Sequence, residues 1–171
     1  MRKLIIFVIC CILVVSNGIN SYAAENNEQK FYVVINDEEI VFEGDNYVNP
    51  ETGEYFYWKD ASRGTDKTFE FKIRYSVQSS SFTIAGSSAI VRSMGEIKDF
   101  NGNVLSAYTS QRYEVGLSGA SSASFEPLVG YQTSYLFNAI SGGSYRVTIR
   151  NPIDLRNVDA YLEGYGSITS N

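Results

Sequence analysis

The sequence has no histidine and only two cysteines, and both cysteines lie in an apolar run near the N-terminus, at Cys10 and Cys11. The rest of the chain therefore cannot build a Ser-His-Asp or Cys-His catalytic centre, or a zinc site of the usual His/Cys kind. Carboxylates, hydroxyls, tyrosine and lysine are the remaining side chains for acid–base chemistry. Because no motif of paired carboxylates is recognisable among them, we expect a protein that is not an enzyme and that uses no cofactor.

The chain also lacks a basic stripe. Residues 24–60 hold ten Asp or Glu and two Lys, a net charge of −8, whereas residues 61–171 hold nine acids and ten bases, a net charge of +1. Surfaces that bind nucleic acid are basic, so nucleic acid is excluded as a partner. The acidic part favours solubility, or alternatively attraction of a cation or a basic partner. A calcium site near Asp37–Asp45 stays open, with five acids available: Asp37, Glu38, Glu39, Glu43 and Asp45.

No apolar run is long enough to span a bilayer, which takes about 20 residues. The twelve residues Leu4–Val15 follow Arg2 and Lys3 and precede Ser21-Tyr22-Ala23, the pattern of a secretory signal peptide with cleavage after Ala23. We expect residues 1–23 to be removed, and an uncleaved anchor is the alternative. The mature chain would then carry no disulfide and no stable membrane anchor. A bacterial protein that is secreted or held in the cell envelope fits these features best.

Apolar residues alternate with polar ones along most of the mature chain, which is typical of half-buried antiparallel strands. The clearest case is KTFEFKIRYSVQ, residues 67–78, which predicts one strand. Its inward-facing residues would be Phe69, Phe71, Ile73, Tyr75 and Val77. The same alternation predicts strands with inward residues Tyr113, Val115 and Leu117; Tyr145, Val147 and Ile149; and Val158, Ala160, Leu162 and Ile168.

Turn signals separate these runs. Asn101-Gly102 is the preferred pair of a type I′ hairpin, and residues 36–38 would join strands at 31–35 and 39–43. Within NPETG, residues 49–53, the four residues Pro50-Glu51-Thr52-Gly53 predict a β-turn, and residues 141–144 a turn between two strands. We therefore expect residues 24–171 to form one all-β domain. Its predicted architecture is a single antiparallel β-sandwich of eight to ten strands, immunoglobulin/fibronectin-like or jelly-roll-like.

A short local resemblance points the same way. The segment AISGGSYRVTIRN, residues 139–151, resembles the loop that leads into a late strand of fibronectin-type and immunoglobulin-like sandwiches. In those sandwiches an apolar residue, a glycine-containing turn and a tyrosine precede a Val-x-Val pair. Ile140, Gly143, Tyr145, Val147 and Ile149 occupy these positions here. The resemblance implies a sandwich and no particular family.

Four aromatic residues stand in a row at residues 55–58, YFYW, and include the only tryptophan. On a strand, Tyr55 and Tyr57 would face one way and Phe56 and Trp58 the other. Burying the second pair costs less, because phenylalanine has no polar atom and tryptophan has a single donor. We therefore predict that Phe56 and Trp58 lie in the core. The predicted ligand-binding surface consists of Tyr55 and Tyr57, with Tyr47 added from the preceding loop.

These observations favour a secreted, non-catalytic binding protein whose partner is an extracellular protein or a glycan. One alternative is a carbohydrate-binding accessory domain. The other is an antimicrobial or membrane-active protein, since the Ser/Thr-rich residues 75–93 resemble segments that form membrane hairpins in pore-forming toxins. Two ordinary strands, at 77–85 and 89–94, explain the same residues.

Overall fold

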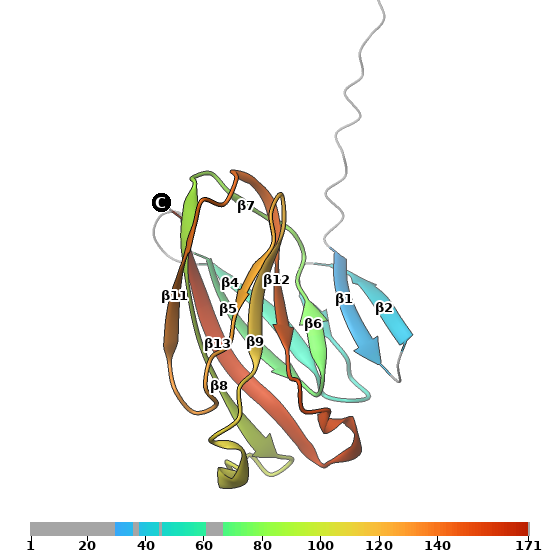
Figure 1. Ribbon diagram of the computed structural model, residues 1–171. Coiled ribbons are helices and arrows are strands. Elements are labelled where there is room, and N and C mark those ends of the chain that lie inside the picture. Colours follow the sequence, from blue (N-terminus) through green and yellow to red (C-terminus); the bar gives the residue numbers. More distant parts are fainter. Residues whose placement is uncertain (1–29, 36–37, 45, 61–66, 171) are drawn as a thin grey trace, which may run out of the picture.

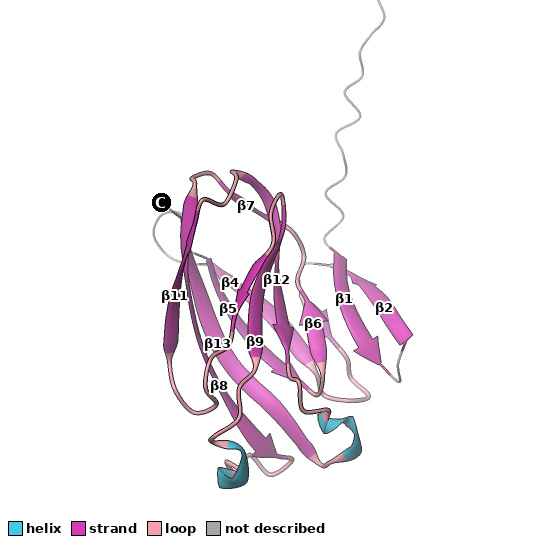
Figure 2. Ribbon diagram, viewed as in Figure 1, coloured by secondary structure: helices cyan, strands magenta, loops and turns pink. Residues whose placement is uncertain are grey.

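Two packed β-sheets make up the part of the chain that the structure describes, which is residues 30–35, 38–44, 46–60 and 67–170 of a computed structural model (Figure 1). All pairs of named strands are antiparallel. Two short 3₁₀ turns, Ser106–Tyr108 and Leu155–Asn157, are the helical elements of the described residues (Figure 2). The predicted antiparallel β-sandwich is confirmed. No helix in this part of the chain is long and apolar enough to cross a membrane.

Sheet A has seven strands and sheet B has six. Sheet A runs in the order β10 (Ala123–Phe125), β9 (Glu114–Gly119), β12 (Gly143–Arg150), β6 (Ser76–Gln78), β1 (Lys30–Ile35) and β2 (Glu38–Glu43), and β7 (Phe82–Ile84) also pairs with β12. Sheet B runs in the order β11 (Thr133–Asn138), β8 (Ser88–Asp99), β13 (Ala160–Ser170), β5 (Lys67–Ile73), β4 (Tyr55–Asp60) and β3 (Tyr47–Val48).

The inward-facing residues of both sheets form one hydrophobic cluster between the layers. In β5, Phe69, Phe71 and Ile73 are at most 1% exposed, while the residues between them are half-buried. Sheet A contributes Val115, Leu117 and the inward residues of β12 to the cluster, together with Tyr113. Strand phase was therefore predicted correctly for most of the core. Val158 is an exception, because it precedes β13 and is 40% exposed.

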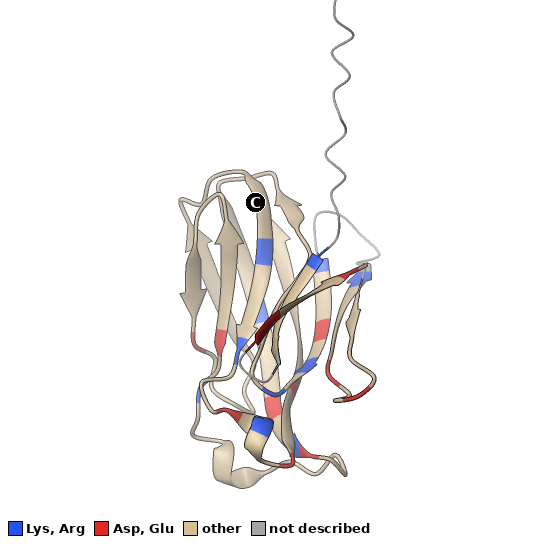
Figure 3. Cartoon of the chain, turned by 90° about the vertical axis from the view of Figure 1, so that its right-hand side faces the viewer, with Lys and Arg blue, Asp and Glu red and all other residues tan. Residues whose placement is uncertain are grey.

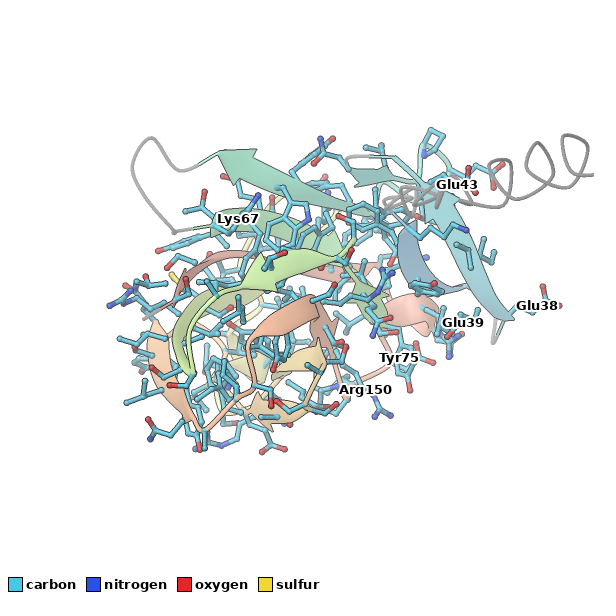
Figure 4. All side chains as sticks on the ribbon, turned by 90° about the horizontal axis from the view of Figure 1, so that it is seen from above. Glu38, Glu39, Glu43, Lys67, Tyr75 and Arg150 are labelled. Carbon is cyan, nitrogen blue, oxygen red and sulfur yellow. The ribbon has the colours of Figure 1, made fainter. Side chains whose placement is uncertain are left out.

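The prediction of one strand over residues 67–78 is wrong. The chain leaves sheet B after Ile73 and joins sheet A at Ser76, so β5 and β6 lie in opposite layers. Tyr75 lies at this crossing and is not in the core. Its hydroxyl accepts a hydrogen bond from Arg150 at 3.1 Å, and Figure 4 shows the two side chains near each other. Val77 is buried as predicted, because both sheets bury their inward side chains in the same core.

The strand count differs for the same reason. The described residues contain thirteen strands instead of eight to ten. The predicted strand at 77–85 is divided into β6 and β7, and buried Ser79 and Ser80 lie between them. The predicted strand at 89–94 is part of the longer β8. Residues 141–144 lead from β11 in sheet B to β12 in sheet A, so this turn connects layers and does not close a hairpin.

Three turns were predicted from local chemistry. The hairpin of β1 and β2 forms, with Ile35 paired to Glu38. The chain turns at residues 50–53 as predicted, but the Gly53 amide donates to the Asn49 carbonyl at 2.8 Å, so the bond that closes the turn spans five residues instead of the four of a β-turn. The prediction of a type I′ turn at Asn101-Gly102 is wrong, because such a turn needs a positive φ at both residues and Asn101 does not have one. Gly102 has φ 84°, and its amide donates to the Asp99 carbonyl at 3.0 Å.

Candidate ligand-binding face

The aromatic run forms β4, and its inner half lies in the core as predicted. Phe56 is fully buried, and the half-buried Trp58 packs against the core. The centroid of the Trp58 ring lies 5.2 Å from that of Phe56 and 5.3 Å from that of Phe82. Its indole Nε1 donates to Ser80 Oγ at 2.9 Å. This bond satisfies the one polar atom that burial of Trp58 would otherwise isolate.

Tyr55 and Tyr57 lie on the opposite face of β4, also as predicted. Both are half-buried, and their rings stack on each other with centroids 4.8 Å apart and an interplanar angle of 29°. They therefore present neighbouring ring surfaces on the outside of sheet B. Their role in binding a ligand stays a prediction.

The expectation that Tyr47 belongs to this surface is wrong. Tyr47 is in β3 and pairs directly with Phe56, and residues that are directly opposite in an antiparallel pair point to the same side of the sheet. Tyr47 is accordingly fully buried, with its ring 4.7 Å from Phe42 and 6.4 Å from Phe31. It supports the core below the candidate site and is not available to a ligand.

Strand register brings further side chains beside the two tyrosines. Tyr57 lies opposite Glu70 of β5, Glu70 opposite Tyr165 of β13, and Tyr165 opposite Met94 of β8. The next outward row runs from Tyr55 through Lys72 and Glu163 to Glu96. We call this outer surface of sheet B the tyrosine face; it consists of Tyr55, Tyr57, Lys59, Thr68, Glu70, Lys72, Arg92, Met94, Glu96, Lys98, Glu163, Tyr165 and Ser167.

The tyrosine face contains two adjoining hollows. One, of about 230 Å³, is lined by residues that include Tyr55, Glu96 and Glu163. The other, of about 270 Å³, is lined by residues that include Arg92 and Ser167. Glu70 and Tyr165 line both hollows. Tyr165, which is 49% exposed, therefore stands between two concave subsites.

Charged groups around the hollows are largely paired with one another. The Lys98 ammonium lies 3.4 Å from carboxylate oxygens of both Glu96 and Glu163. The Tyr55 hydroxyl donates to Glu163 at 3.2 Å, and Lys59 forms an ion pair with Glu70. Each carboxylate thus has a partner within the face and keeps acceptor positions free, since a carboxylate offers about four lone pairs.

Burial and the carboxylate together hold the Tyr55 hydroxyl protonated. Burial, the charge of Glu163 and the hydrogen bond to it together raise the pKa of Tyr55 to about 12. A neutral Tyr55 remains a donor to Glu163 across the physiological pH range. This bond fixes the position of the carboxylate in the first hollow.

Two glycines flank Tyr165 and let β13 lie close to its neighbours. A Cβ on Gly164 would come within 2.1 Å of the Met94 carbonyl oxygen, and one on Gly166 within 2.2 Å of the Phe69 ring. Both positions face the core, where the rings of Phe71 and Phe69 occupy the space that a side chain would need. The glycines therefore make it possible for Tyr165 to sit over a tightly packed pair of phenylalanines.

Sequence reasoning missed Tyr165, Glu163 and Glu70. Their signal is the alternation already used for the core: if Ala160, Leu162 and Ile168 face inward, Glu163 and Tyr165 face outward. The sequence does not show that β13 lies beside β5 and β5 beside β4. Without that strand order, the sequence does not place Tyr55 and Tyr57 on the same surface as Tyr165.

The acidic cluster does not form a metal site in the described residues. Glu38, Glu39 and Glu43 are exposed on β2, spread along the strand as Figure 4 shows. Asp37 and Asp45 lie outside the described residues. No group of three or more potential metal-ligating side chains is found in the part of the chain that the structure describes.

No protein family model matches the chain, and no curated protein matches it. Among solved structures, the chain is similar to one titled "Structure of a family two carbohydrate esterase from Cellvibrio japonicus", at 14% sequence identity and a TM-score of 0.37. The match covers 75% of this chain and 29% of that chain. A likeness this low carries no argument about function.

Proposed function

We propose that this protein is a non-catalytic carbohydrate-binding protein that acts outside the cell, and that the tyrosine face holds its ligand. The observation that carries the proposal is the position of Tyr165 between two hollows, beside the stacked rings of Tyr55 and Tyr57. The proposed export rests on the signal peptide predicted at residues 1–23. The exported chain should begin at Ala24, and a measurement of its intact mass tests this.

The three tyrosines suit the apolar faces of sugar rings. The face of an aromatic ring carries partial negative charge and attracts the C–H groups of a pyranose, while burial of both surfaces adds a hydrophobic contribution. Tyrosine does this at low entropic cost because its side chain has two rotatable torsions. Glu163 to Ser167 span about 13 Å along β13 at about 3.3 Å per residue, which gives room for a short oligosaccharide.

The carboxylates suit the hydroxyl groups of the same ligand. An ionised carboxylate only accepts hydrogen bonds, and bonds to it are stronger than those between neutral groups. Glu70, Glu96 and Glu163 keep acceptor capacity toward the hollows, while Lys59 and Lys98 balance part of their charge. With Lys72 and Arg92 the tyrosine face holds four basic and three acidic side chains, so its charges nearly balance, and a neutral, hydroxyl-rich glycan is the ligand that we expect.

A glycan array followed by calorimetric titration of the best ligand tests the proposal. Tyr165→Ala should weaken binding about tenfold or more, because it removes the ring that both hollows share. Tyr57→Ala should weaken binding less, because Tyr57 lines neither hollow and acts through its stacking on Tyr55, which lines the first one. The matched control is Tyr131→Ala, which removes a tyrosine that is 61% exposed and does not line either hollow. Its affinity should equal that of the unaltered protein.

Two outcomes would overturn the proposal. One is an array on which no neutral glycan binds. The other is a ligand whose affinity is unchanged in Tyr165→Ala. If the protein instead released dye from liposomes, the membrane-active alternative would replace the carbohydrate-binding one.

A further inference from the structure

Among the described residues, β10, β2, β11 and β3 are the edge strands of the two sheets, and the three-residue β7 also pairs on one side only; these strands differ in how they are protected. An edge strand exposes unpaired backbone donors and acceptors, and proteins limit wrong pairing by making edges short or charged. β10 has three residues and β3 has two, so both edges are short. β2 has six residues but carries Glu38, Glu39 and Glu43. β11 also has six residues and carries no charge at all.

β11 is uncharged, and four of its six residues are exposed. Its Tyr135 is 47% exposed and its Leu136 is 46% exposed. The strand lies within nineteen residues without any charge, Pro127–Tyr145. Among the described residues β11 pairs with β8 on one side and with no strand on the other. It thus has none of the three usual protections, which are shortness, charge and cover.

We propose that the β11 edge pairs, antiparallel, with the β11 edge of a second copy of this chain. Identical strands related by a two-fold axis meet antiparallel, and each then satisfies the outer backbone groups of the other. In this arrangement sheet B continues across the axis into the second copy. The uncharged sequence TSYLFN is compatible with itself, because no like charges are brought together at the contact.

The distribution of charge favours a second copy at this edge. Of residues 24–60, the described residues 30–35, 38–44 and 46–60 hold six acids and two lysines, a net charge of −4, and β1 to β4 are made of them. In Figure 1, β1 and β2 lie at one margin of the molecule and β11 at the opposite margin. Figure 3 looks onto the β1–β2 side and shows acidic residues there. Two acidic molecules can therefore approach through β11 with their most strongly charged parts far apart.

This pairing would have a consequence for ligand binding that rests on the proposed function. A two-fold axis normal to the sheet keeps the outer faces of both copies on the same side. Two tyrosine faces would then lie on one continuous surface, and a polymeric glycan could engage both. Such bivalent binding raises avidity without any new contact.

Light scattering coupled to gel filtration, at increasing protein concentration, tests the pairing. The unaltered protein should show the mass of a dimer. Leu136→Lys should raise the dimer dissociation constant at least about tenfold, because it places two cations at the shared edge. Leu136 is suitable because it pairs with Ile90 on the outer side of sheet B. Tyr135 is less suitable, since its ring stacks on Phe125 at 5.4 Å.

Two further variants keep the test decisive. Val41→Lys makes the same change on β2, at a residue that is 47% exposed, and should leave the dimer intact. Ser134→Glu places an acid opposite Arg92, so its monomer should stay folded while two copies repel each other. A monomeric unaltered protein at all concentrations would overturn the pairing, as would folded Leu136→Lys and Ser134→Glu variants that remain dimeric. Neither result depends on whether a glycan binds.

Discussion

At the scale of single residues, Trp58 joins the candidate site to the core. It follows Tyr57 in β4, but its ring contacts Phe56, Phe69 and Phe82. Its place at the core margin means that ligand should not reach it, while the strand that holds Tyr55 and Tyr57 depends on it. The two neighbouring residues Tyr57 and Trp58 therefore have separable roles.

Truncation of Trp58 tests this separation. Trp58→Ala should lower the free energy of unfolding by about 3 kcal/mol, the lower end of the range for buried aromatic residues, because the indole is only partly buried. Chemical denaturation followed by circular dichroism measures the change. Trp58→Phe, the control, keeps a ring but loses the bond to Ser80, and should cost about 1 kcal/mol. An unchanged free energy in Trp58→Ala would mean that the indole is not part of the core.

Sequence reasoning placed Tyr55 to Trp58 correctly but placed Tyr47 at the surface. For residues 55–58, alternation within one strand and the cost of burying polar atoms decide the faces, and both are local properties. The face of Tyr47 depends on its pairing with Phe56, nine residues further along the chain. Pairing register is not visible in a two-residue strand, so the prediction could not find it.

At the scale of strands, the inward phase of residues 67–77 was predictable except at Tyr75, but the assignment of the parts of this run to sheets was not. Phe69, Phe71 and Val77 are buried although β5 and β6 belong to different sheets. Both sheets of a sandwich bury the same kind of side chain, so alternation shows which residues face inward and not which layer they belong to. The same limit hid the adjacency of β4, β5 and β13 on which the tyrosine face depends.

The glycines of β13 give a prediction for the strand as a whole. Gly166→Ala should destabilise the protein by about 1–3 kcal/mol, because the added Cβ would lie 2.2 Å from the Phe69 ring and 2.6 Å from the Arg92 carbonyl oxygen. Thermal and chemical denaturation measure the loss. Gly116→Ala in β9 is the matched control: its Cβ would meet neighbours at 3.5 Å or more. That change should be neutral or stabilising by a few tenths of a kcal/mol. Equal effects of the two changes would contradict the close packing under Tyr165.

At the scale of the whole molecule, several tyrosines make the stability of the folded protein sensitive to alkaline pH. Burial raises the pKa of Tyr47, with a further contribution from Glu54, and burial also raises the pKa of Tyr113. Tyr55 and Tyr161 shift in the same direction. Tyr47, Tyr55 and Tyr161 belong to strands of sheet B, and Tyr113 packs against that sheet. The chain has no histidine, so no histidine adds a transition near neutral pH.

These shifts predict a loss of stability in alkali. Above about pH 10 the unfolded chain releases its tyrosine protons, while the folded protein retains those of the buried hydroxyls. The folded state then binds more protons, so the contribution of these tyrosines to the free energy of unfolding should be constant from about pH 8 to pH 10 and fall as the pH rises through the folded pKa values. Each such tyrosine adds a slope of up to about 1.4 kcal/mol per pH unit. Denaturation curves from pH 8 to pH 12 measure the slope.

Tyr47→Phe identifies one source of this slope. The residue is fully buried, and the change removes only its hydroxyl, so the fold should stay intact. The slope of the free energy of unfolding against pH should fall by up to about 1.4 kcal/mol per pH unit, the contribution of one proton. Tyr131→Phe removes a hydroxyl from a side chain that is 61% exposed and should leave the slope as it was. If Tyr47→Phe and Tyr131→Phe gave the same slope as the unaltered protein, Tyr47 would have to ionise in the folded state, and its place in the core beneath β4 would be wrong.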